Sequence, residues 1–465
     1  MQVANKNNKC FPILRTEIKG RIDPYFYKPE FIEIDKKLRK LKHKTIKEIS
    51  LDLKNGSTPT GGIFTKDGIP YFRSQDFNLF NFRKKQCITP EFHKKINRSA
   101  IKPNDVLVAV VGATLGVIGY VPDDIVEGNI NQNVARIRVV DKEINPKYLA
   151  IFLSSSIGQN LIFRNATITT QAYLNNEQLG AIEVVVPSLE TQNKIVEIMQ
   201  SGYKKKESKE QEAKNILNTI DDYILKELGV KMPETKDREC FCINSKELGR
   251  RLDCYYYQPK FKEAEKLFKK ASYEFEPLKN YITKIHYGAS LKNNYVEEGI
   301  PLLRIQNLKP NKIILSDIVK ISETRKKELG NAFVNEGDLL ISRSGSVGIV
   351  SIVPKEAEGF AFGSFMIKFC LNDKIDKDFV SMWLNNKISQ LFIKREKIGA
   401  IQGNITIETI ENLQIPTPTL KIQRKLANEA KERMAQAHKL KVESKIEIEK
   451  AKQEIKKIIL ADNAK

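Results

Sequence analysis

The stretch Gly68-Ile-Pro-Tyr-Phe-Arg-Ser-Gln-Asp76 decides the fold, because it recurs 231 residues later as Gly299-Ile-Pro-Leu-Leu-Arg-Ile-Gln-Asn307. Three further segments recur at nearly the same offset: Arg21-Ile-Asp-Pro-Tyr-Phe-Tyr27 as Arg251-Leu-Asp-Cys-Tyr-Tyr-Tyr257, Asn104-Asp-Val-Leu-Val108 as Gly337-Asp-Leu-Leu-Ile341, and Pro187-Ser-Leu-Glu-Thr-Gln192 as Pro418-Thr-Leu-Lys-Ile-Gln423. An offset that stays nearly constant over most of each half indicates a tandem duplication.

Each half has the pattern of a compact α+β domain. Short apolar runs such as 69–73 and 106–111 are separated by Gly, Pro and Asn turns, as strands are. A helix is expected to begin at Asn145-Pro146, because Asn is a good N-cap and Pro suits the first helical position. One helical face in each copy is apolar and is interpreted as core: Tyr148, Leu149, Phe152, Leu153 and Ile157, then Phe379, Val380, Trp383, Leu384 and Ile388. The predicted domains comprise residues 21–188 and 251–419, after an N-terminal segment of residues 1–20.

A long helix is predicted after each domain, over residues 189–229 and 420–465, with a linker at 230–250 between the two repeats. Their apolar stripes are too narrow to cover a globular core and suit helix–helix packing with a period near 3.5. At about 1.5 Å per residue each helix is roughly 60 Å long. Because neither would be stable alone, we expect the two helices to form an antiparallel coiled coil.

The charge balance favours a polyanionic partner. The chain has 78 Lys and Arg against 57 Asp and Glu, a formal net charge of +21. Lys and Arg gain free energy by displacing the counterions condensed on nucleic-acid phosphates. A lysine-rich genome bias is the alternative explanation. Basic clusters occur at residues 36–47, 83–85, 94–98 and 325–327.

Other compositional features exclude several classes of protein. The six Cys are dispersed, and neither they nor the four His have the spacing of a zinc site, so no metal is predicted. The longest apolar run, 106–111, is far shorter than the roughly 18 residues of a membrane span. Residues 1–20 lack the apolar core of a signal peptide. We therefore expect a soluble, cytoplasmic protein.

The order of the repeated motifs resembles the specificity (S) subunit of type I restriction–modification enzymes. The resemblance rests on Arg-(Ile/Leu)-Asp, Gly-Ile-Pro-x-x-Arg, Asp-(Val/Leu)-Leu, and Pro-x-Leu-x-x-Gln before a long helix, each present twice, and it covers residue 20 to the end. It implies two target recognition domains, an antiparallel coiled coil, double-stranded DNA as ligand and two DNA-methyltransferase (M) subunits as partners, which restriction (R) translocase subunits can join. The family often has Glu-Gln at the helix start, where this chain has Thr191-Gln192 and Ile422-Gln423.

Motifs of catalysis are missing from the sequence. It contains no Asn-Pro-Pro-Tyr type run of adenine methyltransferases and no G-x-x-x-x-G-K-[ST] of ATP-binding loops. Gly112-Ala-Thr-Leu-Gly-Val-Ile-Gly119 does not fit G-x-G-x-x-G and is interpreted as a turn. We expect a chain that is not an enzyme, with S-adenosylmethionine and ATP bound by partner subunits. The alternatives are a diverged, self-contained DNA methyltransferase or nuclease, and a nucleic-acid-binding scaffold without a modifying partner.

Recognition is expected to be bipartite. Each domain would insert loops into a major groove, where every base pair shows a distinct pattern of donors and acceptors, and the helices would set the gap between the two half-sites. Because the domains differ outside their shared motifs, the site should be asymmetric. Ser342-Arg343-Ser344 stands where the first copy has Val110-Val111-Gly112. The candidate DNA contacts, to bases or to phosphates, are Lys54, Thr58, Thr60, Arg73, Gln75, Gln171, Tyr173, Lys292, Asn293, Arg304, Gln306, Arg343, Gln402 and Asn404. For the repeated Arg73 and Arg304, a structural role within the domain is the alternative.

Overall fold

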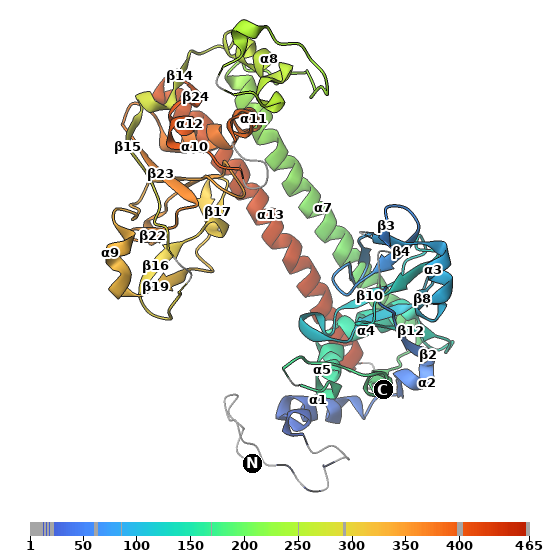
Figure 1. Ribbon diagram of the computed structural model, residues 1–465. Helices are drawn as coiled ribbons and strands as arrows, with labels where there is room; N and C mark the ends of the chain where they lie inside the picture. The colour runs from blue at the N-terminus through green and yellow to red at the C-terminus, as the bar shows by residue number, and fades with distance from the viewer. Residues whose placement is uncertain are drawn as a thin grey trace. The chain divides into compact units, whose positions relative to one another are not determined.

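The computed structural model describes residues 23–59, 64–84, 86–168, 170–249, 251–291, 294–397 and 403–461, together with Ile13, Arg15 and Ile18. The chain divides into two compact units (Figure 1). Unit 1 comprises Met1–Glu210 and Val442–Lys465, and unit 2 comprises Gln211–Lys441. Among the described residues, no helix has both the length and the apolar content needed to cross a bilayer.

Unit 1 is built on two sheets. A four-stranded antiparallel sheet has the order β10 (Ile118–Tyr120), β9 (Val106–Ala109), β12 (Val134–Val139) and β2 (Ser50–Asn55). A five-stranded mixed sheet has the order β3 (Phe64–Thr65), β7 (Gln86–Ile88), β4 (Ile69–Phe72), β11 (Gly128–Ile130) and β8 (Ala100–Ile101). Two short pairs join β1 (His43–Thr45) to β13 (Glu183–Val185) and β5 (Phe77–Asn78) to β6 (Asn81–Phe82). Its shorter helices are α1 (Pro29–Leu38), α2 (Ile46–Ile49), α3 (Pro90–Lys95), α4 (Pro146–Ser154), α5 (Ser156–Asn165) and α6 (Asn176–Gly180).

Unit 2 repeats this plan. Its antiparallel sheet has the order β15 (Ile282–Tyr287), β23 (Met366–Leu371), β20 (Leu339–Ser342) and β21 (Val350–Ile352). The mixed sheet has the order β19 (Val319–Ile321), β16 (Ile300–Leu303) and β22 (Ala361–Phe362). The pairs are β14 (Phe275–Pro277) with β24 (Gln414–Pro416) and β17 (Leu308–Lys309) with β18 (Lys312–Ile313). The helices are α8 (Pro259–Phe268), α9 (Lys326–Leu329), α10 (Lys377–Asn385), α11 (Lys387–Glu396) and α12 (Ile407–Glu411). The matching strand orders confirm the duplicated α+β architecture.

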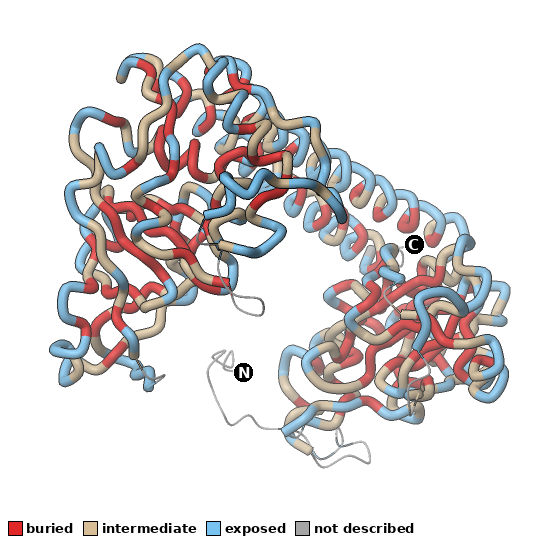
Figure 2. The backbone as a smooth tube through the Cα atoms, turned by 45° about the horizontal axis from the view of Figure 1, so that its top comes forward, coloured by how far each residue is buried: buried red, intermediate tan, exposed pale blue. Residues whose placement is uncertain are grey.

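The apolar stripes predicted as core lie in the core of each unit. Asn145 caps α4 by accepting a hydrogen bond from the Lys147 backbone N–H, and Pro146 occupies the first turn, as the sequence predicts. Tyr148 and Phe152 of α4 and Trp383 of α10 are fully buried, together with the other residues of both stripes. Figure 2 shows buried backbone gathered inside both units. Helices α4 and α10 therefore pack against the antiparallel sheets that carry the repeated motifs.

The two long helices are α7 (Leu189–Glu227) and α13 (Leu420–Ala461), and they pack together. In unit 1, Lys209 of α7 forms an ion pair with Glu443 of α13 at 2.6 Å. In unit 2, the Arg433 guanidinium of α13 donates to the Thr219 carbonyl of α7 at 3.3 Å, and Lys425 pairs with Glu227 at 3.4 Å. Residue numbers fall along α13 as they rise along α7, so the pairing is antiparallel, as the sequence predicts.

The glutamine of Pro-x-Leu-x-x-Gln attaches each long helix to its domain. The Gln192 side-chain oxygen accepts a hydrogen bond from the Asn145 N–H at 2.8 Å, and Gln423 accepts one from the Asp376 N–H at 2.8 Å. Asn145 and Asp376 are the N-caps of α4 and α10. Both glutamines are buried, and each amide also donates to a carbonyl just before its own helix. The repeated glutamine thus satisfies buried backbone groups, a role that the preceding residue does not share.

Ile455 tests the contribution of α13 to unit 1. Its side chain is fully buried in the core that contains Ile195 and Met199 of α7. We expect Ile455→Asp to lower the free energy of unfolding of unit 1 by about 3–5 kcal/mol, because it removes apolar packing and buries a carboxylate. The matched control is Ile446→Asp on the same helix, where the side chain is 44% exposed and the change should stay within about 0.5 kcal/mol. Urea unfolding measures both, and equal midpoints for the two variants would contradict the assignment.

Candidate nucleic-acid interface

Three segments of unit 1 meet at one place, here called loop face 1: residues 73–76, residues 111–116, and residues 167–168 with 170–173. The Thr114 hydroxyl donates to the Ser74 hydroxyl at 2.9 Å, which joins the first two segments. The Gly112 N–H donates to the Ala172 carbonyl at 2.9 Å, which joins the second and third. Loop face 1 therefore brings together candidate residues that are about 100 positions apart in the sequence.

Three of the predicted contacts are exposed on loop face 1. Gln75 and Gln171 are exposed, and Tyr173 is 42% exposed. Gly112 has a positive φ of 71°, and a Cβ there would lie 3.2 Å from the Gln171 side-chain nitrogen. A larger residue at position 112 would therefore strain the turn and crowd Gln171.

The repeated arginine of unit 1 has a partner inside the domain. The Arg73 Nε donates to the Asp76 carboxylate at 3.0 Å, and the Arg73 backbone N–H donates to the same oxygen at 3.0 Å. Asp76 is almost completely buried. This geometry supports the structural alternative for Arg73 and leaves Gln75 as the outward-facing polar residue of the segment.

Lys54 and Thr58 lie near the edge of the same unit. Lys54 is an exposed residue of β2, in register with Arg136 of β12. Thr58 is exposed in the segment after β2, which is held by a hydrogen bond from the Tyr71 hydroxyl to the Ser57 carbonyl at 2.9 Å. Thr60 lies outside the described residues.

Unit 2 has an equivalent surface, loop face 2, made of residues 304–307, 342–348, 363–366 and 403–406. The Ile405 N–H donates to the Arg343 carbonyl at 3.0 Å, and the Arg343 N–H donates to the Phe365 carbonyl at 2.9 Å. Ser344 and Asn404 form an isolated β-bridge, as Val111 and Tyr173 do in unit 1. The predicted residues Lys292, Asn293 and Gln402 lie outside the described residues.

Two backbone hydrogen bonds of loop face 2 have counterparts in loop face 1. In unit 1 the Leu174 N–H donates to the Val110 carbonyl at 2.9 Å, and the Val110 N–H donates to the Asn133 carbonyl at 2.8 Å. Arg343 therefore occupies the backbone position of Val110, one residue from the alignment with Val111 that the sequence suggests. Aligning Gly112 with Gly345, the glycines that follow the two strands, gives the same correspondence as the backbone hydrogen bonds.

Arg304 and Gln306 are both bound by one carboxylate. The Asp317 side chain accepts a hydrogen bond from the Arg304 guanidinium at 3.0 Å and one from the Gln306 amide at 2.6 Å. The Arg304 guanidinium also lies over the Tyr295 ring, 5.5 Å from its centroid. Asp317 was not predicted from the sequence, since only the fold brings it next to residues 304–306.

Exposed aromatic residues of loop face 2 and its margin were also not predicted. Tyr287, Tyr295 and Phe365 are 40%, 41% and 53% exposed. Tyr287 ends strand β15 and Phe365 directly precedes strand β23, so the sequence pattern alone does not mark these two as exposed. Aromatic side chains stack on bases and arginines and are frequent in nucleic-acid interfaces.

Both units also carry exposed basic residues outside the loop faces. In unit 1, Lys94 and Lys95 of α3 are exposed and form no ion pair with a described residue. The exposed Arg98 donates through Nε to the Ser57 hydroxyl at 3.3 Å, next to Thr58. In unit 2, Lys309 and Lys312 are exposed on the β17–β18 hairpin. Such residues suit contacts with phosphates, which position a protein on DNA without reading its sequence.

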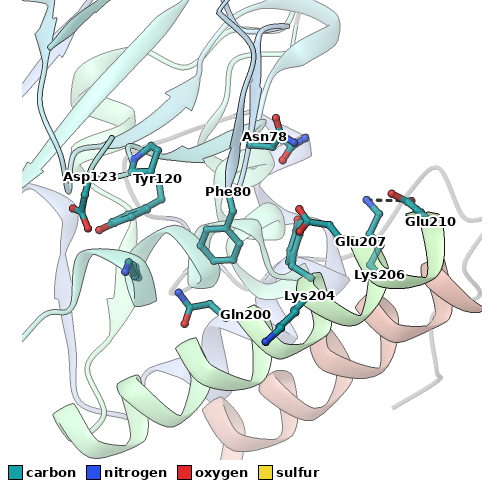
Figure 3. A pocket seen from close by; sticks show the side chains of 13 residues that line it. Asn78, Phe80, Tyr120, Asp123, Gln200, Lys204, Lys206, Glu207 and Glu210 are labelled. Carbon is teal, nitrogen blue, oxygen red and sulfur yellow. Dashed lines mark ion pairs between the residues drawn. The ribbon is translucent and has the colours of Figure 1, made fainter. Parts of the chain in front are cut away.

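A cavity of about 420 Å³ lies between the β5–β6 hairpin, Tyr120 and α7 (Figure 3). The rings of Phe80 and Tyr203 meet edge to face across it, with centroids 5.1 Å apart. The described residues that line it include no Ser, Cys or His, the usual nucleophiles and bases of covalent catalysis. The aromatic contact holds the hairpin that follows residues 73–76 against α7.

No metal centre is formed by the described part of the chain, in which no three His, Cys, Asp or Glu side chains are grouped as ligands. The structure instead defines a class of protein with two related recognition units, each presenting loops from the same framework. The family model of the type I restriction modification DNA specificity domain matches residues 39–218 and 260–453, so the chain belongs to that family.

Relatives of the chain carry the same description. It is 35% identical over 162 residues to the type I restriction enzyme EcoBI specificity subunit of Escherichia coli, a match that spans 34% of this chain and 33% of that subunit. It is 22% identical over 387 residues to the MjaVIII specificity subunit of Methanocaldococcus jannaschii, across 80% of this chain and 82% of that subunit. A chain in a structure of complex assembly and conformational transition of a type I R-M system has a similar fold, with a TM-score of 0.53 and 15% identity over 90% of this chain and 96% of that chain.

Two buried tyrosines of unit 1 make its stability depend on pH. Burial raises the pKa of Tyr71 and of Tyr120 to about 12, from an ordinary value of 10.0. Because the unfolded chain releases these protons first, the stabilisation is complete below pH 10 and is lost as the pH rises toward 12. Absorbance titration should show these two phenols ionising late, and Tyr71→Phe should remove one late step and make the stability loss shallower. An unchanged late amplitude in Tyr71→Phe would contradict the assignment.

Proposed function

We propose that the chain is the non-catalytic subunit that selects the DNA sequence for a type I restriction–modification complex. Each loop face would read one half of a bipartite, asymmetric site. The observation that carries this proposal is that the two loop faces share the backbone hydrogen bonds of Val110 and Arg343 but differ in the side chains at that position. A common framework with different exposed residues suits two readers of different half-sites.

The helix pair supports a role as the spacer between the two half-sites. Both α7 and α13 contribute residues to unit 1 and to unit 2. Two recognition units on one chain bind much more tightly than one, because the second contact forms at a high effective concentration. A rigid spacer would also reject sites of the wrong gap, since each base pair moves a half-site by about 3.4 Å and turns it by roughly 35°.

The partners in this proposal are double-stranded DNA, two DNA-methyltransferase subunits docked along the helix pair and, in a restriction complex, R translocase subunits. S-adenosylmethionine and ATP would be bound by those partners. The relatives named as specificity subunits support this reading. Neither alternative, a diverged self-contained enzyme or a scaffold without a modifying partner, has support from the family match.

Selection from random double-stranded DNA tests the proposal. The full chain, purified with a DNA-methyltransferase subunit with which it assembles, should enrich two short unrelated sequences separated by a gap of fixed length. Methylome sequencing of cells with and without the gene should reveal the same two-part motif. Enrichment of a single continuous site, or methyl transfer by the purified chain alone, would refute the proposal.

Lengthening both long helices tests the spacer. Seven residues inserted after Glu210 of α7 and seven after Lys441 of α13 add one heptad at the boundaries between the units. Each insertion lengthens a helix by about 10.5 Å, so the selected gap should grow by about 3 base pairs at about 3.4 Å each. The matched control is an insertion in α7 alone, which breaks the pairing of α7 with α13 and should abolish selection of a fixed gap. An unchanged gap in the doubly extended chain would refute the spacer role.

A further inference from the structure

Arg343 lies where the segments of loop face 2 meet. Its backbone N–H donates to the Phe365 carbonyl at 2.9 Å and its carbonyl accepts from the Ile405 N–H at 3.0 Å. The equivalent residue of unit 1 is Val110, whose side chain is buried in the core. The position is therefore held by the same framework in both units, whereas the side chain differs completely in charge and reach.

The guanidinium of Arg343 is held by an aromatic ring. It lies over Tyr287, 4.6 Å from the ring centroid, and the Tyr287 ring is itself 40% exposed. In unit 1 the strand register places Asn55 at the position of Tyr287, since Asn55 pairs with Ala135 and Tyr287 with Ile367 on equivalent strands. Unit 2 thus has a cation and the ring on which it stacks at the two positions where unit 1 has Val110 and Asn55. Stacking restricts the plane of the guanidinium and lowers the entropy lost when it binds a ligand.

Arg343 differs from the other predicted arginines in having no acidic partner. Arg73 is bound by Asp76 and Arg304 by Asp317. Arg343 forms no ion pair with any described residue, and its Nε is buried without a hydrogen-bond partner. A half-buried guanidinium without a carboxylate retains its terminal N–H donors for a ligand. The aromatic Phe365 beside it, 53% exposed, reduces the competition from water.

We propose that Arg343 reads a guanine in the half-site bound by unit 2, with Tyr287 as its positioning residue. This inference rests on the proposed function and names one specificity determinant of it. Two parallel N–H donors of a guanidinium match O6 and N7 of guanine in the major groove, and no other base presents two acceptors there in this geometry. Val110 offers no donor, so unit 1 cannot read its half-site in this way.

Arg343→Val is the decisive variant, because the chain already has Val at this framework position in unit 1. Selection from random DNA with the full chain and its methyltransferase should keep the half-site of unit 1 and the gap unchanged. At one position of the other half-site, the preference for guanine should fall by about 10- to 100-fold. Lys374→Ala, which removes a charge from an exposed turn of the same unit, is the matched control and should alter no position. An unchanged guanine preference in Arg343→Val would overturn the inference.

Variants of Tyr287 and the salt dependence of DNA binding distinguish base reading by Arg343 from phosphate binding. Tyr287→Phe keeps the ring and should retain the guanine preference, whereas Tyr287→Leu should weaken it. If Arg343→Val instead weakens binding to all sequences equally and lowers the salt slope by about one, Arg343 contacts a phosphate and the inference is overturned. If the wild-type chain selects no two-part site, the proposed function fails, an outcome distinct from unaltered selectivity in the variant. Equal thermal unfolding of the variants and the wild type excludes misfolding as the cause.

Discussion

The apolar core of each unit depends on a helix that the other repeat of the chain supplies. Ile455 of α13 is fully buried with Ile195 of α7 in unit 1, and Ile224 of α7 is fully buried with Leu426 of α13 in unit 2. Burying one such side chain contributes about 1.5–3 kcal/mol. Several such side chains from each helix together contribute as much as the whole free energy of unfolding of a typical domain, about 5–15 kcal/mol. A repeat expressed alone, cut at its boundary in the sequence, would therefore lack the part of its core that the other repeat's long helix supplies.

Much of the architecture could be predicted from repeated motifs and from the spacing of apolar residues. The constant offset between motifs identified the duplication, and the apolar stripe after Asn145 identified α4 and its copy α10. The thin stripes of the long helices predicted an antiparallel pair, and α7 ends at Glu227, just before Gly229 adopts a positive φ of 66°. The apolar stripes and the helix ends depend on neighbours within one or two turns, and the duplication is visible because whole motifs recur at a constant offset.

The details of the loop faces could not be predicted, since they depend on contacts between distant segments. The carboxylate that binds Arg304 belongs to Asp317, and the ring under Arg343 belongs to Tyr287. The repeated residues Gln192 and Gln423 satisfy backbone groups, whereas Val110 and Arg343 differ at equivalent positions of the two loop faces. Repetition at Gln192 and Gln423 therefore accompanies a structural role, and divergence at an equivalent position marks where the two loop faces differ in chemistry.

The interlaced helices also govern how the chain can fold during its synthesis. Ile455 completes the apolar core of unit 1, and it is translated about 250 residues after Met199, a residue of the same core. At about 5–20 residues per second, the nascent unit waits roughly 10–50 s with that apolar face uncovered. Unit 2 meanwhile receives all of its residues, 211–441, and can close before its neighbour. Unit 1 is thus the unit that is synthesised first and the one whose core is completed last. Until residue 455 leaves the ribosome, its uncovered apolar face must be kept from aggregating.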